Sequence, residues 1–132
     1  MNWNEFEKEI EKLTTIIDSP VDIIVPIARG GFVPGRLLAS HLHVKTMFAI
    51  TVIKSDTERF VATEIKVDVK GKNVLLVEDM LESGASIEIA KIYLETKGAK
   101  AKTACLYTMP QTKITPDYFL KKVSSPVTFP WE

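Results

Sequence analysis

The chain has 132 residues, of which 45% are apolar and 26% are charged, a balance typical of a globular domain with a buried core. Seventeen basic and seventeen acidic residues cancel, and no basic or basic–aromatic run occurs, so neither nucleic acid nor a membrane surface is an expected partner. The single cysteine, Cys105, excludes an internal disulfide framework. The glutamate-rich segment 1–13 is no signal peptide, so a cytoplasmic location is expected.

Helical and strand patterns alternate along the chain. Apolar residues at helical spacing predict amphipathic helices, and short apolar runs between turn residues predict strands buried on both faces. In chain order, the expected elements are a helix from Asn2 or Asn4 to Ile17, a strand over 21–27, a helix over 32–42, a strand over 46–53, a polar excursion over 54–60, an edge or hairpin strand over 63–69, a strand over 73–77, a helix over 87–97, and strands over 102–107 and near 118–123.

This alternation predicts one α/β domain over residues 1–132, with a parallel sheet flanked by helices and joined by right-handed crossovers. In sheets of this kind, ligands bind beyond the carboxyl ends of the strands. Two loops are expected at that edge, over residues 28–31 and 78–86. We therefore look for the chemistry of the protein in these two loops.

The loop over residues 78–86 combines acids with small residues. Glu78 and Asp79 follow a buried strand, Glu82 comes three residues later, and small residues then lead into a helix. Free N–H groups at a helix N-terminus, with Gly84 permitting close approach, form a phosphate cradle. Since carboxylates repel phosphate, the acids are expected to serve sugar hydroxyls, a bound cation or a proton. The triphosphate-binding and dinucleotide-binding glycine motifs are both absent.

Residues 74–86, a hydrophobic strand followed by two acids, two apolar residues, an acid and Ser-Gly-Ala-Ser, resemble the phosphoribosyl-pyrophosphate motif of type I phosphoribosyltransferases. Residues 25–35 resemble the pyrophosphate loop of the same family, closest to its xanthine–guanine and archaeal 6-oxopurine members. The resemblance implies the type I phosphoribosyltransferase fold, with a core over about 18–109 and a C-terminal base-binding hood over about 110–132. It also implies transfer of a phosphoribosyl group from phosphoribosyl pyrophosphate to a purine base in purine salvage, with Mg²⁺ as cofactor and a homodimer as the assembly.

The same resemblance implies roles for individual residues. Glu78 and Asp79 would bind the ribose hydroxyls, directly or through Mg²⁺, and Glu82 and Arg29 are the catalytic candidates. A fixed cation such as Arg29 suits a departing polyanion. The implied pyrophosphate ligands are Ala28, Arg29, Gly30, Gly31 and Lys54; the implied 5′-phosphate ligands are Glu82, Ser83, Gly84, Ala85 and Ser86; and the implied base contacts are Met109, Pro126 and Val127.

The base is the point at which this sequence departs from the family pattern. Met109 stands where 6-oxopurine enzymes carry a Lys that donates to the 6-oxo group, and Pro126 stands where they carry a stacking aromatic. Since Met109 would tolerate a 6-amino group, adenine joins the 6-oxopurines as a candidate. Two other hypotheses stay open: a phosphoribosyltransferase for orotate or another pyrimidine, and a non-catalytic regulator that binds phosphoribosyl pyrophosphate or a nucleotide. Residues 54–62 fall where the family has a mobile closing loop.

Overall fold

The three helices form on the apolar stripes of the sequence. The computed structural model describes residues 1–132, with α1 over Trp3–Ile16, α2 over Phe32–His41 and α3 over Ala85–Thr96. At the start of α1, the Asn2 side chain accepts from the Glu5 N–H, and the Glu5 carboxylate accepts from the Asn2 N–H. This capping box fixes where the helix begins. None of the helices is long and apolar enough to cross a membrane.

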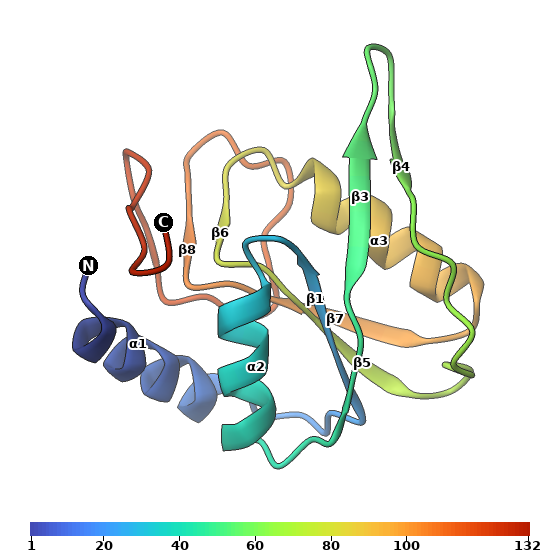
Figure 1. Cartoon of the computed structure of the whole chain (residues 1–132), viewed down its shortest axis with the longest axis horizontal. Coiled ribbons are helices and arrows are strands. Elements are labelled where there is room, and N and C mark those ends of the chain that lie inside the picture. The colour runs from blue at the N-terminus through green and yellow to red at the C-terminus, as the bar shows by residue number, and fades with distance from the viewer.

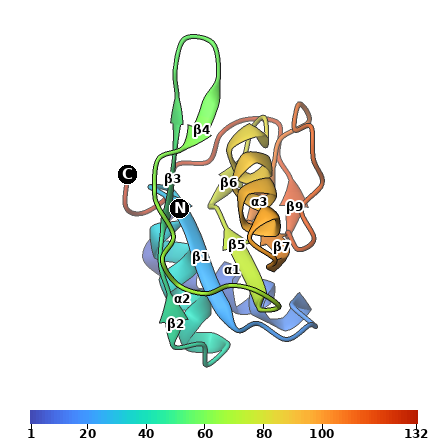
Figure 2. The same cartoon turned by 90° about the vertical axis from the view of Figure 1, so that its right-hand side faces the viewer.

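A mostly parallel sheet lies between the helices (Figures 1 and 2). Its strands lie in the order β4-β3-β1-β5-β7, and a short strand, β2, also pairs with β1. Only the β3–β4 pair is antiparallel. The bounds are β1 Ile23–Ala28, β2 Thr46–Met47, β3 Ile50–Lys54, β4 Arg59–Val61, β5 Asn73–Val77 and β7 Lys100–Ala104.

Side-chain alternation along β1 divides the core into two parts. Ile24 packs in a cluster with the apolar residues of α1 and α2, whereas Ile23 and Val25 pack in a second cluster with those of α3. A strand that buries both faces in this way reads as a continuous apolar run. The predicted α/β class, with a parallel sheet flanked by helices, is therefore confirmed.

A second, smaller sheet lies beyond the carboxyl ends of β5 and β7. It joins β6 (Met80–Leu81), β8 (Tyr107–Thr108) and β9 (Lys121–Lys122), all in parallel. The chain passes from the large sheet to the small one at two neighbouring places, after Val77 and after Ala104. The acidic loop therefore lies at the junction between the two sheets.

Most predicted elements are confirmed, some of them divided. The helices lie within two residues of the expected bounds, and β5 covers the expected 73–77. The strand predicted over 46–53 consists of β2 and β3, with a break at Phe48-Ala49, and the strand predicted over 102–107 divides into β7 and β8. β2 and β3 both pair with β1, at its start and at its end, whereas β7 pairs with β5 in the large sheet and β8 pairs with β6 in the small one.

The edge strand predicted over residues 63–69 is wrong, because the strand beside β3 is β4, Arg59–Val61, within the expected polar excursion and its edge. The antiparallel ladder ends where the Thr63 hydroxyl accepts from the Thr51 N–H at 2.9 Å. The chain then leaves the sheet and packs Ile65 and Val69 into the α3 side of the core. Burial of Ile65 and Val69 explains the alternating apolar pattern over residues 63–69, although this segment pairs with no strand.

The C-terminal segment contains less regular structure than expected. Of the strand predicted near 118–123, only Lys121–Lys122 forms a ladder, and Tyr118 makes an isolated bridge to Ala104. Residues 123–132 contain no strand or helix. Their placement depends on side-chain packing.

Candidate functional site

The acid pair after β5 is held by the backbone of the neighbouring strand. The Glu78 N–H donates to the Ala104 carbonyl at 3.0 Å, and the Leu106 N–H donates to the Asp79 carbonyl at 3.0 Å. The Asp79 carboxylate accepts from the Met80 N–H at 2.7 Å. The backbone of both residues and the Asp79 carboxylate therefore have a defined position between the two sheets.

Burial makes this acid pair reluctant to carry two negative charges. It raises the pKa of Glu78 to about 8, with a further rise from the charge of Asp79 and an opposing effect from the Arg59 guanidinium. The pKa of Asp79 is also raised, mainly by burial, while the Met80 N–H acts in the opposite direction. A cation or hydroxyl donors placed against the pair would stabilise its ionised form.

The loop after β1 lies directly against the acid pair. A methyl group on Gly30 would lie 2.7 Å from the Asp79 carboxylate, and one on Gly31 would lie 2.1 Å from the carbonyl of Val77. Only glycine allows this close approach. The Ala28–Arg29 peptide bond is cis, and the N–H groups of Arg29 and Gly30 have no hydrogen-bond partner within the protein. The Arg29 side chain is exposed and forms no ion pair.

The loop over residues 83–86 presents free N–H donors at the start of α3. Gly84 is its N-cap in the left-handed conformation, at φ +77°. The N–H groups of Ser83, Gly84, Ser86 and Ile87 donate to no other group of the protein, and only the Ala85 N–H is used, by the Ser83 hydroxyl. Unpaired donors at a helix N-terminus are well suited to an anion such as phosphate.

Arg59 brings the β3–β4 hairpin to this cradle. Its guanidinium donates to the Ser86 hydroxyl at 3.0 Å, across 27 positions of the sequence. It is also close enough to Glu78 to lower the pKa of that carboxyl. From the sequence, Arg59 is assigned only to the closing loop over residues 54–62. Its contact with Ser86 could not be predicted, because no local sequence pattern indicates that the hairpin reaches α3.

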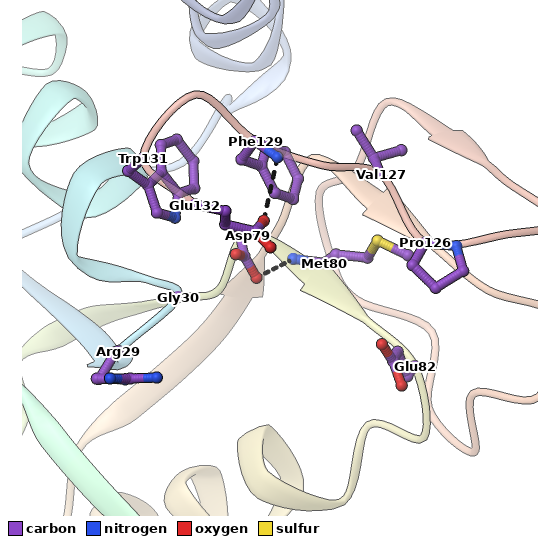
Figure 3. Close-up of a pocket in the computed structure, with 10 residues that line it drawn as sticks. All are labelled: Arg29, Gly30, Asp79, Met80, Glu82, Pro126, Val127, Phe129, Trp131 and Glu132. Atoms are coloured by element: carbon purple, nitrogen blue, oxygen red, sulfur yellow. Dashed lines mark hydrogen bonds between the residues drawn. The ribbon is translucent and has the colours of Figure 1, made fainter.

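A cavity of about 760 Å³ joins the two loops to the C-terminal segment (Figure 3). In Figure 3, Arg29 lies at one end, Asp79 in the middle, and Phe129 and Trp131 along another wall. Six predicted site residues line this cavity: Arg29, Gly30, Asp79, Glu82, Pro126 and Val127. Four further lining residues were not among the individually predicted ligands, although the last three lie in the predicted base-binding hood: Met80, Phe129, Trp131 and Glu132.

The remaining predicted residues lie at different distances from the cavity. Glu78 and residues 83–86 do not line the cavity but are next in sequence to the lining residues Asp79 and Glu82. In the same way, Ala28 and Gly31 lie within two residues of the lining residue Gly30. Lys54 lines a separate exposed pocket on the hairpin. Met109 is buried, and its sulfur lies 3.8 Å from the Gln111 amide nitrogen, outside the cavity lining.

The phosphoribosyl transferase domain family matches residues 2–132. The chain belongs to this family. The match includes both loops and the C-terminal cavity wall, and it confirms the family resemblance inferred from residues 25–35 and 74–86.

Three similar proteins match this chain over 99% to 100% of its length, and each is named as a purine-related phosphoribosyltransferase. The protein is 28% identical to the xanthine-guanine phosphoribosyltransferase of Gluconobacter oxydans, over 100% of this chain and 83% of that protein. Its fold matches the purine phosphoribosyltransferase of Pyrococcus horikoshii with a TM-score of 0.92 and 29% identity, covering 100% and 92% of the two chains. The xanthine-guanine-hypoxanthine phosphoribosyltransferase of Helicobacter pylori matches with a TM-score of 0.84 and 26% identity, covering 99% and 90%.

The residues at the acid pair fit a hard divalent cation such as Mg²⁺. Such an ion prefers oxygen ligands, and it commonly binds through one or two carboxylates together with substrate phosphates and water. Glu78 and Asp79 supply the carboxylates, while no group of three or more His, Cys, Asp or Glu side chains is set for a metal ion. Two carboxylates hold an ion of this kind only together with further oxygen ligands from phosphate or water.

Proposed function

We propose that this protein transfers the 5-phosphoribosyl group of phosphoribosyl pyrophosphate to a purine base, giving a nucleoside monophosphate and pyrophosphate in purine salvage. The observation that carries the proposal is one cavity with three chemically different parts. Arg29 and Gly30 form a cationic, donor-rich end, Asp79 lies in the middle, and the C-terminal segment supplies an apolar wall. A diphosphate, a sugar and a base require these three environments in this order.

The donor substrate would be held by the two loops. The free N–H groups of residues 83–87 and the Arg59 guanidinium suit the 5′-phosphate end, and those of Arg29 and Gly30 suit the pyrophosphate. Glu78 and Asp79 would accept from the ribose hydroxyls. When bound there, Mg²⁺ supplies positive charge to the diphosphate.

In the reaction, the bond from the anomeric carbon to the pyrophosphate oxygen breaks, and its electron pair leaves with pyrophosphate. A ring nitrogen of the base forms the new bond to that carbon. Arg29 stabilises the departing charge, and the Glu82 carboxylate, which lines the same cavity, is placed to take the proton that the base loses. The protein contributes mainly by positioning the reactants.

The base itself is the finer part of the proposal. Pro126 and Val127 line the cavity and would contact the base, whereas Met109 is buried, is not part of the lining and offers no charged donor. We therefore propose a site that accepts adenine as well as 6-oxopurines. The homodimer implied by the family and the cytoplasmic location expected from the N-terminal sequence stay predictions.

Pyrophosphate release tests the proposal. The protein should be incubated with phosphoribosyl pyrophosphate, Mg²⁺ and, in separate reactions, adenine, guanine, hypoxanthine, xanthine, orotate or uracil. Release that depends on a purine is expected. Release only with orotate or uracil would identify a pyrimidine enzyme. Binding of the donor without release on any base would identify a regulator.

A further inference from the structure

The C-terminal wall of the cavity has almost no backbone attachment to the rest of the protein. Residues 124–132 form no backbone hydrogen bond with the two sheets, and their only outside backbone contact is a 3.3 Å bond from the Met1 amino group to the Thr128 carbonyl. Two bonds link Phe129 and Glu132 within the segment itself. The position of this wall must therefore come from side-chain packing.

That packing is a series of aromatic rings that ends on α1. Phe129 stacks on Trp131 with ring centroids 4.8 Å apart and an interplanar angle of 5°, and it lies parallel to Tyr107 at 6.2 Å. Phe6 of α1 meets Trp131 edge to face at 4.8 Å, and Trp3 lies 6.1 Å from the same ring. Figure 1 shows the start of α1 beside the C-terminal end of the chain.

The donor side of the cavity has a different attachment. Glu78 and Asp79 are bonded to the backbone of residues 104–106, and Gly30 packs against Asp79. None of these contacts involves α1. Because Trp131 packs directly on α1 and Phe129 stacks on Trp131, we expect a change at the start of α1 to move this wall more than the donor loops.

We propose that Trp3 and Phe6 are positioning residues for the base end of the cavity, acting through Trp131. This rests on the proposed function, since it is the function that makes this end the base end. Phe6 is fully buried, so it also serves the core. Trp3 is 54% exposed, so its ring can be removed with little loss of core packing.

The kinetic test uses Trp3→Ala. We expect KM for the purine to rise about fivefold, the factor that corresponds to about 1 kcal/mol for one aromatic pair. The KM for phosphoribosyl pyrophosphate and kcat should change little. The control is Ile16→Ala, at the far end of the same helix, where the side chain is exposed and does not line the cavity. An unchanged purine KM in Trp3→Ala, or an equal change in all constants, would overturn the proposal.

A second test does not depend on turnover. The chain has two tryptophans, so Trp3→Phe leaves Trp131 as the only one. In that background, Phe6→Leu should increase quenching of Trp131 fluorescence by acrylamide, while Ile16→Ala should leave it unchanged. Equal quenching in both variants would show that α1 does not hold the wall. If the wild type used no base, the proposed function would fail while this measurement still decided the role of α1.

Discussion

The two sides of the cavity are built in opposite ways. On the donor side, loops 28–31 and 78–86 follow directly from strands and are bonded to the backbone of neighbouring elements. On the base side, residues 124–132 have no regular structure and depend on aromatic packing against α1 and Tyr107. The proposed donor contacts thus rest on backbone geometry, while the proposed base contacts rest on side-chain packing.

This difference indicates which side of the cavity tolerates amino-acid substitutions. A loop whose backbone approaches another chain segment closely accepts few substitutions, because a single methyl group collides with a carbonyl or a carboxylate. A wall made of packed side chains can change its shape by substitution without breaking any strand ladder. Pro126 and Met109, the two departures from the family pattern, both lie outside the donor loops.

Removal of the cation is expected to have the largest effect on turnover, and it tests the donor side of the comparison. If the donor side works as proposed, chelation with excess EDTA should abolish pyrophosphate release, and added Mg²⁺ should restore it, because the charged donor loses its neutralising ion. Pyrophosphate release is the measurement. Full turnover in EDTA would show that the reaction does not require a metal ion.

Alanine substitutions at the two adjacent glycines of the donor side should affect different properties, stability at Gly31 and activity at Gly30. Gly31→Ala should lower the free energy of unfolding by about 3 kcal/mol, because its methyl group would collide with the Val77 carbonyl. Gly30→Ala meets only the Asp79 side chain, so it should cost about 100-fold in kcat/KM with a smaller loss of stability.

Thermal unfolding and steady-state kinetics would check this pair. Gly71→Ala is the control for activity: nothing lies within 4 Å of its added methyl group, so kcat/KM should stay at the wild-type value, while its backbone at φ +72° should cost some stability through strain alone. If Gly30→Ala kept wild-type activity, the position of the Asp79 side chain would not be important for catalysis.

Arg59 tests whether the hairpin belongs to the donor side. Arg59→Ala should raise KM for phosphoribosyl pyrophosphate about 30-fold, because one charged hydrogen bond near the phosphate cradle is lost. The purine KM should stay close to that of the wild type. Glu58→Ala, at the exposed tip of the same hairpin, is the matched control. Equal kinetics in the two variants would place the hairpin outside the site.

The smallest expected effect concerns the base. Met109→Lys should shift relative efficiency toward 6-oxopurines and away from adenine by about tenfold, since a charged donor favours an oxo group over an amino group. Competition between hypoxanthine and adenine measures the shift, with Met109→Leu as the control. An unchanged ratio would show that position 109 does not act on the base.

Much of the donor side could be predicted because its signals are local. A strand, two acids and a helix start stand in one continuous stretch, and α1 begins at a cap visible in the sequence. The contact between Arg59 and Ser86 could not be predicted, because it depends on how far the β3–β4 hairpin reaches over α3.

The family resemblance implied a base-binding hood over about 110–132, but the packing of this segment on α1 could not be predicted. The pairing of Phe6 with Trp131 joins opposite ends of the chain, and no periodicity marks it. The mistaken strand over 63–69 has a related cause, because burial of Ile65 and Val69 imitates the alternation of a paired strand.

The central claim is that Glu78 and Asp79 hold the sugar of a phosphoribosyl donor whose phosphate lies on the adjacent loop. Calorimetric titration of phosphoribosyl pyrophosphate with Mg²⁺ into the wild type and into Glu78→Ala/Asp79→Ala tests it most directly, with the exposed Glu95→Ala as control. The wild type and the control should bind with the same affinity, and the double variant should give no binding heat. Equal affinity in all three proteins would contradict the account.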